Sequence, residues 1–587
     1  MSEKKMNDAG ILQYLEATLS GATSYHAEAL GVAQASRDAY NGELQGNEDP
    51  NWSNIVVKDI KRIVNGAIPS LVEPFMTDTI VSLDTNQAQM VDGLKKSEAL
   101  LNYQWGNVID PMSTAELAAY NQMIDGTAWA MTGWDKKGHP TVNIVPFESV
   151  IPDPSAYDVD DMKFVIYRRK VTISDILSNP KWFGKHTLEG LNTLSSPSTS
   201  EYDPDPVPGR EDSYDPGNRA LEEVEVFEYY GFLDTDGKGI AKPFLGIWSN
   251  GKLLRSGDNP YPGFVIPFDR AVYSRKPFSV YGETIEELVG DYQRLRTSIT
   301  RGIIDNMANS NNGVRFVKKN ALDATNFQRL LDNERVVELN VGKDAPVANA
   351  IEYGSFNPLP ADVYKMLEDT MKEEENITGI TRYSVGSDSR SLNQTATGIG
   401  IITDMSQRRL TYLTAQLAVM FKGVILKWAK LNAAIVTDVT VKTPRGYMQI
   451  AGPELVGDEF GITMNTPTAG IKQKKQADLT TMIQSLAPLT GLIGPEVLLG
   501  LLTEMADLAT MPKLRNELYR ITAEVEQNKG QMSEEQQLAL QKVQLEMSKT
   551  QSETMENVAS AKKSQADADQ ANMATVLASF GNAEVTI

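Results

Sequence analysis

The side chains that most often perform chemistry in proteins are absent or scattered in this sequence. The chain has no cysteine, which excludes disulfides, thiolate nucleophiles and cysteine-bound zinc. Its three histidines, His26, His139 and His186, lie far apart, and none has a second histidine at the spacing of metal ligands. We therefore expect these histidines to be ordinary surface or core residues, and we expect no metal and no cofactor.

Sequence motifs for nucleotide and hydrolase chemistry are also missing. No G-x-x-x-x-G-K-[ST], H-E-x-x-H or G-x-S-x-G motif occurs. Gly398 and Gly400 lack the third glycine of a dinucleotide fingerprint and lie in a helical pattern. The acidic stretch 234–237 is similar to the start of a calcium loop, but the later ligands do not fit, so we predict a simple turn. These absences favour a protein that is not an enzyme.

The net charge bounds the possible partners. The chain carries a formal charge of −21 over 587 residues. An acidic surface does not hold a phosphate backbone by counterion release, so the charge fits either an ordinary acidic protein or one that lets DNA pass without gripping it. The N-terminus lacks the apolar region of a signal peptide, and no apolar run reaches the roughly 18 residues of a membrane span. We expect cytosolic synthesis and no membrane partner.

Hydrophobic periodicity predicts an α+β chain that is predominantly helical. The first 125 residues are expected to be helical, with helices at 54–68 and 71–80 separated at Pro69. A further helix is predicted at 113–123, and the Asn250-Gly251 pair predicts a hairpin turn. Strands are predicted at 141–154, 163–171 and 223–233, and a Pro/Ser/Asp-rich loop at 195–218.

Long helices dominate the second half. The first, at 283–310, would be about 42 Å long. One side of it carries an apolar stripe made of Ile285, Leu288, Val289, Tyr292, Leu295, Ile299, Ile303 and Met307. Further helices are predicted at 361–377 and 395–434, separated by a Gly/Ser-rich loop. The stretch 533–572 has only a thin apolar stripe, so it is expected to be frayed or packed against its own copies.

The order of these elements resembles that of the portal proteins of short-tailed, double-stranded DNA phages. Three stretches are also similar to portal segments: SLVEPFMTDTIVSLDTN, NIVPFESVIPDPSAYDVDDMKFVIYRR and ITRYSVGSDSRSLNQTATGIG. The resemblance covers roughly residues 35–470. It implies the portal fold, with a wing, a stem, a clip and a helical crown or barrel. The implied boundaries are 1–282 wing, 283–310 first stem helix, 311–360 clip, 361–378 second stem helix, 379–394 tunnel loop, 395–465 kinked wing helix with strands, 466–530 crown and 531–587 C-terminal helix.

The resemblance also implies a function. The protein would form a ring of about twelve copies at one capsid vertex and act as the channel for DNA packaging and ejection. Its partners would be the terminase large subunit, a tail adaptor, the major capsid and scaffolding proteins, and duplex DNA passing without sequence-specific binding. It would be a virion component assembled in the bacterial cytoplasm. The alternatives are another head–tail structural protein, such as an adaptor or minor head protein, and a cytosolic coiled-coil scaffold.

The candidate site residues come from the same resemblance. Acids on the stem helices would line the channel and repel phosphate: Glu283, Glu287, Asp291, Glu368 and Glu373. The run Glu373-Glu374-Glu375 is interpreted as a solvated face. Tunnel-loop residues would touch the DNA backbone or merely keep the loop soluble: Arg382, Ser384, Ser387 and Arg390. Basic clip residues would dock a partner or pair with nearby acids of the clip: Arg315, Lys318, Lys319, Arg329 and Arg335.

Overall fold

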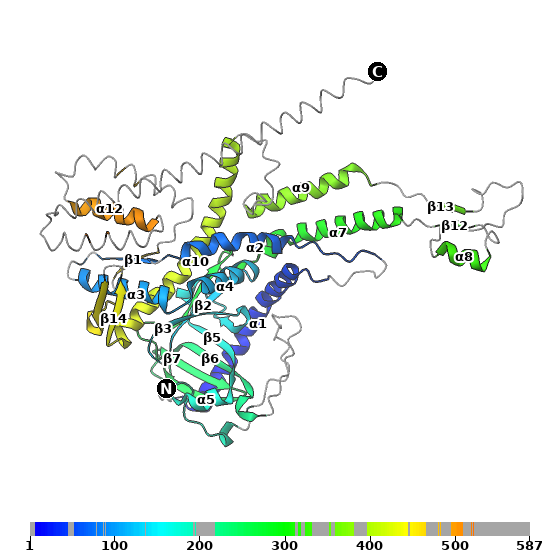
Figure 1. Ribbon diagram of the computed structural model, residues 1–587. Helices are drawn as coiled ribbons and strands as arrows, with labels where there is room; N and C mark the ends of the chain where they lie inside the picture. The colour runs from blue at the N-terminus through cyan, green and yellow to red at the C-terminus, as the bar shows by residue number, and fades with distance from the viewer. Residues whose placement is uncertain are drawn as a thin grey trace, which may run out of the picture. The chain divides into compact units, whose positions relative to one another are not determined.

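Figure 1 shows the helices and strands of the chain in a computed structural model. The chain divides into two compact units. The first unit comprises Met1–Val439 with Ile450–Thr466, and the second comprises Thr440–Gln449 with Pro467–Ile587. The structure describes residues 6–44, 52–191 (without 78, 86, 88, 89 and 136), 194, 218–311, 315–317, 323–331, 351–353, 359–380, 396–443, 446–464 (without 459), 479, 482, 495–508, 518 and 521. The predicted mixture of helix and strand is confirmed.

Helices supply most of the described residues. They are α1 (Asp8–Asn41), α2 (Asp59–Val72), α3 (Val91–Asn107), α4 (Pro111–Ile124), α5 (Ile173–Ser178), α6 (Pro180–Phe183), α7 (Ile285–Asn311), α8 (Ala324–Leu331), α9 (Ala361–Thr378), α10 (Ala396–Ile435) and α12 (Pro495–Leu508). The helices predicted at 113–123, 283–310, 361–377 and 395–434 are therefore confirmed as α4, α7, α9 and α10.

Within the described residues, the strands form two larger sheets and four two-stranded ribbons. A five-stranded antiparallel sheet has the order β4 (Val150–Pro152), β5 (Phe164–Thr172), β6 (Glu223–Leu233), β7 (Lys242–Ser249) and β8 (Lys252–Asp258). A three-stranded sheet has the order β3 (Pro140–Val145), β2 (Thr127–Trp134) and β9 (Phe268–Val272). The ribbons are β1 (Val81–Asp84) with β16 (Gly461–Met464), β10 (Ser274–Arg275) with β11 (Gly282–Glu283), β12 (Arg315–Val317) with β13 (Ile351–Tyr353), and β14 (Asp438–Thr443) with β15 (Gly446–Ala451).

The first unit buries three apolar clusters, one of which gathers residues of both larger sheets, among them Trp129, Tyr230 and Phe268. The main core joins α2, α3, α4 and α10 to the three-stranded sheet, and Phe421 of α10 lies 5.1 Å, ring centre to ring centre, from both Phe75 and Trp105. The five-stranded sheet packs against the N-terminal half of α1, where Leu15 meets Tyr229 and other sheet residues. A Cβ at Gly246 would lie 2.7 Å from the side chain of Leu15, so this glycine lets the helix approach the sheet closely.

Helix α10 contains a long apolar segment that is partly buried in the protein. Its segment Arg409–Ile435 is long and apolar enough to cross a membrane by those criteria alone, but half of its apolar window is buried inside the protein. Trp428 and Phe421 are fully buried in the main core. A core helix passes the same test, so this segment is weak evidence for a membrane span.

Two local predictions have contrasting outcomes. Asn250 and Gly251 join β7 to β8 with φ values of 45° and 73°, which confirms the hairpin turn. The helix break predicted at Pro69 is wrong, because α2 runs from Asp59 to Val72 with Pro69 inside it. Pro69 lies on the exposed side of the last turns, where the lost hydrogen bond costs little against the buried apolar face of α2. Residues 54–58 precede the helix, and a short 3-10 turn at 73–75 replaces the second helix.

Candidate functional site in the paired helices

Helix α7 is fixed to the rest of the first unit at its N-terminus. Thr284 and Glu287 form a reciprocal cap, with the Thr284 amide donating to Glu287 (2.9 Å) and the Glu287 amide donating to Thr284 Oγ1 (3.2 Å). Lys276 also binds Glu287 at 2.7 Å. Just before the cap, the backbones of Gly282 and Gly126 lie very close together. A Cβ on Gly282 would be 2.4 Å from the carbonyl oxygen of Gly126. The start of the helix is thus set by tight backbone packing.

One face of α7 is a polar ladder at four-residue intervals that holds the chain segment leading into α2. Its rungs are Gln293 Oε1 accepting from the Ile60 amide (2.9 Å), Thr297 Oγ1 from the Val57 amide (3.2 Å), Arg301 donating to the Ile55 carbonyl (2.8 Å) and Asp305 accepting from the Ser53 amide (2.7 Å). Gln293 also donates to the Ala39 carbonyl of α1 at 2.8 Å. Each four-residue step turns about 40° around the helix axis, so the ladder winds gradually around one side of α7.

The burial of the apolar stripe of α7 changes along the helix. Ile285 and Val289 are buried in the main core, and Leu288 packs against it. Farther along, Leu295 is 37 % exposed and Met307 is 57 % exposed, with Tyr292, Ile299 and Ile303 half-buried. The first third of the stripe is therefore core, and the rest remains open on the single chain.

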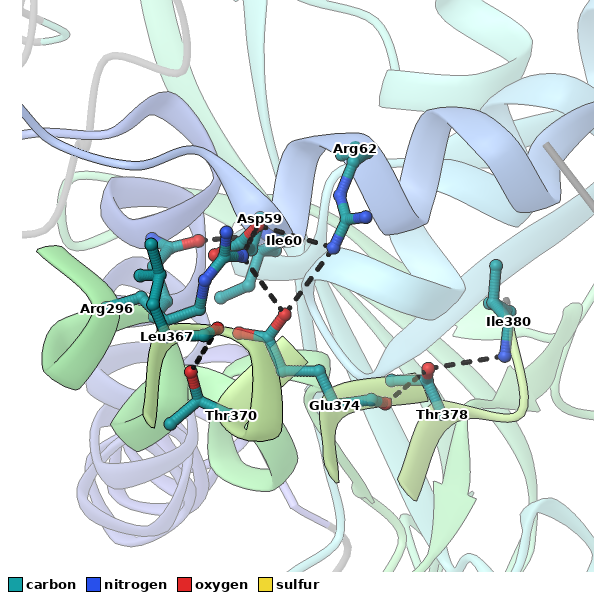
Figure 2. Close-up of polar contacts among 10 residues, drawn as sticks. Asp59, Ile60, Arg62, Arg296, Leu367, Thr370, Glu374, Thr378 and Ile380 are labelled. Atoms are coloured by element: carbon teal, nitrogen blue, oxygen red, sulfur yellow. Dashed lines mark hydrogen bonds and ion pairs between the residues drawn. The ribbon is translucent and has the colours of Figure 1, made fainter. Parts of the chain in front are cut away.

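Helix α9 lies beside α7, as Figure 1 shows, and contributes a buried polar face. The buried residues of α9 are Thr370, Glu374 and Thr378, spaced four residues apart. Figure 2 shows Glu374 pointing toward Arg296 of α7 and toward Asp59 and Arg62 of α2. We call these four residues, Asp59, Arg62, Arg296 and Glu374, the charge cluster.

The charge cluster joins three helices through ion pairs. Glu374 Oε2 lies 3.5 Å from Arg62 Nη2 and 3.5 Å from Arg296 Nη1. Asp59 Oδ1 lies 3.3 Å from Arg62 Nη2 and also contacts Arg296 Nη1. Glu374 is 0 % exposed and Asp59 is 3 % exposed. Two acids and two arginines from three helices thus meet at one site, where Asp59, Arg296 and Glu374 are buried and the Arg62 side chain is 33 % exposed.

Burial sets the protonation of the cluster. Burial, the largest cause, and the neighbouring Asp59 carboxylate raise the pKa of Glu374, Arg296 and Arg62 lower it, and the net result is a pKa of about 8. Two carboxyl groups this close resist being ionised together. The interpretation of Glu373-Glu374-Glu375 as a solvated face is therefore wrong for Glu374. Glu373 is exposed, and the central residue of the run turns inward.

The C-terminal turn of α9 is anchored next to the cluster. Thr378 Oγ1 donates to the Glu374 carbonyl at 2.7 Å, and the Ile380 amide donates to Thr378 Oγ1 at 3.3 Å. Gly379 adopts a left-handed φ of 67°, and its amide donates to the Glu375 carbonyl at 2.8 Å. Ile380 is 3 % exposed. The exit of the chain from α9 is therefore held in one place.

The five predicted stem acids fall into two groups. Glu283 lies in β11 and accepts from Ser274 at 2.6 Å, and Glu287 caps α7. Asp291 is highly exposed and pairs with Arg294 at 2.7 Å, Glu368 is exposed and pairs with Lys372 at 2.9 Å, and Glu373 is exposed. The first two are thus bound at the base of the helices, while the other three remain on the outer surface of the single chain.

The predicted clip residues are only partly described. The segment between α7 and α9 contains the pair β12–β13, in which Arg315 lies opposite Tyr353, and α8, whose N-terminus is capped by Asp323 accepting from the Asn326 amide at 2.8 Å. Arg329 is half-buried on α8. Lys318, Lys319 and Arg335 lie outside the described residues. The tunnel-loop residues Arg382, Ser384, Ser387 and Arg390 also lie outside them.

Sequence reasoning missed the residues that hold the two helices in place. Gln293, Arg296 and Thr297 are buried, although they are polar residues and the sequence pattern marked only the apolar residues of α7 for burial. The available signal was the repeat of polar residues at 293, 297, 301 and 305, but such a repeat is more often solvent-facing. Among the described residues, no group of His, Cys, Asp and Glu is placed to hold a metal ion.

A comparison with protein-family models gives a match over nearly the whole chain. The matching family is described as phage SU10 portal protein, and the matched residues are 11–139 and 135–553. The match includes α2, α7, α9 and α10, and thus every residue of the charge cluster and of the polar ladder.

Proposed function

Because this chain belongs to the phage portal protein family, as a structural component of the phage particle, we propose that it forms a closed ring of about twelve copies at one capsid vertex. In this proposal α7 and α9 are the stem, residues 311–360 are the clip, and the elements of 1–282 with 395–465 are the wing. A crown at 466–530 and a C-terminal helix at 531–587 would complete the subunit.

The observation that carries the ring proposal is the open half of the apolar stripe on α7. Leu295 and Met307 are exposed and Ile299 and Ile303 half-buried, while the polar face of the same helix is bound inside the chain. A helix that turns its polar side inward and leaves apolar side chains outside gains stability when another surface covers them. In a ring of head-to-tail contacts, the neighbouring copy supplies that surface.

The ring proposal is tested by the mass of the full-length protein in solution. Multi-angle light scattering is expected to give about twelve times 64.6 kDa, and the Ile299→Asp variant is expected to shift the population to lower mass. The control is Ile240→Asp, which places the same charge at an apolar residue that is 66 % exposed between β6 and β7 and should keep the ring. A stable monomer of the unaltered chain at every concentration and salt would refute the proposal.

The same arrangement supports a channel for DNA. Asp291, Glu368 and Glu373 are exposed acids on the paired helices, and an acidic wall repels phosphate so that a duplex slides through. Passage in both directions, during packaging and during ejection, requires this low affinity. Arg382, Ser384, Ser387 and Arg390 of the proposed tunnel loop would supply brief contacts to the backbone.

Docking of other proteins is assigned to the clip. Residues 315–335 contain five basic residues against three acidic ones on a chain of net charge −21, and this local excess would favour acidic partners. The five are Arg315, Lys318, Lys319, Arg329 and Arg335. We assign to it the terminase large subunit during packaging and the tail adaptor afterwards, with the major capsid and scaffolding proteins around the wing. Assembly would take place in the bacterial cytoplasm.

A further inference from the structure

The charge cluster is an unusual way to hold a helix, because buried ion pairs stabilise less than apolar packing. Taking Asp59, Arg296 and Glu374 out of water carries a desolvation penalty that the mutual attraction of the four charges only partly offsets. The pairing here is also incomplete, since within the described part of the chain Nε of Arg62 and Nε of Arg296 are buried without a hydrogen-bond partner. The charge cluster therefore contributes less stability than its number of ion pairs suggests. That contribution depends on the charge of each of its four residues.

The surroundings of Glu374 confine its ionic contacts to the cluster. Among the described residues, the charged groups that act on it are Asp59 and Arg62 from α2 and Arg296 from α7. On α9 itself, the adjacent buried side chains are the neutral Thr370 and Thr378, whose hydroxyls bind backbone carbonyls. The protonation of one carboxyl group therefore changes the balance between the two acids and the two arginines.

We propose that the charge cluster is a proton-dependent latch that holds α9 against α2 and α7 when Glu374 carries a proton and loosens it when Glu374 is ionised. With Glu374 neutral, Asp59 is the one carboxylate left in the cluster and both arginines can serve it. With Glu374 ionised, two buried carboxylates share the same two guanidinium groups. Separation of α9 would let the ionised carboxylate reach solvent.

The direction of the effect comes from proton linkage. The docked helix binds the Glu374 proton more tightly than a solvated carboxyl does, with a pKa of about 8 against the usual 4.5. The latch therefore contributes its full stability below about pH 4.5 and loses it as the pH rises toward 8. The equilibrium constant for docking falls by about tenfold for each pH unit between those limits and is constant outside them.

The latch matters because of the segment that comes after it in the chain. The last turn of α9 fixes Ile380 through Thr378 and Gly379, one turn beyond Glu374. Residues 379–394 are the proposed tunnel loop. Loosening α9 would therefore change the starting point of that loop while leaving the main core of the wing in place. Latching does not require ring formation, since all four residues belong to one chain.

Hydrogen exchange of the full-length protein tests the latch. The protection of the amides of 362–378, corrected for the intrinsic exchange rate at each pH, is expected to fall about a hundredfold between pH 6 and pH 8. Glu374→Gln has nearly the same shape and no ionisable proton, so its protection should not fall. The matched control is Glu373→Gln, which alters the exposed neighbour and should behave like the unaltered protein.

Each outcome decides the question. Loss of protection in the unaltered protein and in Glu373→Gln, but not in Glu374→Gln, supports the latch. Equal corrected protection of α9 at both pH values in the unaltered protein overturns it, as does a full pH response in Glu374→Gln. Light scattering on the same samples reports the ring separately, so a failed latch and a failed ring give different results.

Discussion

The core of the proposed wing, which comprises residues 1–282 with 395–465, and the paired helices α7 and α9 are stabilised in opposite ways. In the core, Phe75, Trp105, Phe421 and Trp428 are almost fully buried, and their rings contact each other directly. Between α7, α9 and α2, the buried side chains include a cluster of charges, and apolar residues such as Leu295 and Met307 are outside. The apolar side chains of the core are thus covered within one chain, whereas some apolar side chains of the paired helices remain exposed.

The apolar core is expected to keep one packing arrangement, whereas the contacts between the paired helices can change with conditions. Apolar contacts are insensitive to pH and salt, and they have no low-energy alternative once packed at interior density. A cluster of paired charges has several arrangements and protonation states of similar energy. Under the function proposed above, a rigid wing core would hold the protein in the shell, and the paired helices would respond to their surroundings.

The largest expected effect is in the wing core. Trp428→Ala removes a fully buried side chain at the meeting point of α10 with Trp105, so the free energy of unfolding should fall by about 3–5 kcal/mol. Trp52→Ala is the matched control, because Trp52 is 51 % exposed and its loss should change stability by less than about 1 kcal/mol. Urea unfolding followed by circular dichroism measures both. Equal effects of the two variants would contradict the assignment of the wing core.

A smaller and more local effect is expected in the charge cluster. Arg296→Met keeps the length of the side chain but leaves Arg62 as the remaining cation of the cluster beside Asp59 and Glu374, at a cost of about 3 kcal/mol in the docking of α9. The loss should appear as faster exchange of α9 amides while the unfolding of the wing is unchanged. Lys372→Met breaks an exposed pair with Glu368 on the same helix and should have no measurable effect. Global unfolding by Arg296→Met would show that the cluster is part of the core.

The sequence predicts the elements well where periodicity is strong. The limits of α7, α9, α10 and β6 agree with the repeats seen in the sequence, because an apolar pattern of fixed period leaves few alternatives. Pro69 shows where local rules fail. Its neighbours Ile68, Leu71 and Val72 are buried in the main core, and that packing outweighs the local tendency of proline to end a helix.

The charge cluster was beyond the reach of sequence reasoning. Asp59, Arg296 and Glu374 lie on three different helices far apart in the sequence, and each looks like an ordinary surface charge in its own segment. Burial of a charge depends on its partners, and partners distant in sequence leave no periodic signal. The open end of the α7 stripe was visible in the sequence, but whether the same chain covers it is a property of the tertiary structure.

The two regions should also respond to pH with opposite signs. In the wing, His26 of α1 is buried between Phe147 and Tyr281, and its Nδ1 lies 2.7 Å from the Tyr281 hydroxyl. Burial lowers the pKa of His26 to about 4, with the nearby Arg168 acting in the same direction and a hydrogen bond with the Glu148 backbone opposing them. The folded wing thus binds this proton less tightly than the unfolded chain does.

The stability that depends on neutral His26 is present above its unfolded pKa of 6.5 and is lost as the pH falls toward 4, by about 2 kcal/mol at pH 4.5. In His26→Gln the side chain can still bond the Tyr281 hydroxyl but cannot titrate, so this variant should lose less stability on acidification. His139→Gln is the control, since His139 is half exposed and pairs at the surface with Asp135. Unfolding midpoints at pH 7 and pH 4.5 measure the difference. Acid is therefore expected to destabilise the region around His26 of α1 and to stabilise the docking of α9 at the charge cluster.

A pH titration in which both regions gained or both lost stability would show that His26 and Glu374 do not control them.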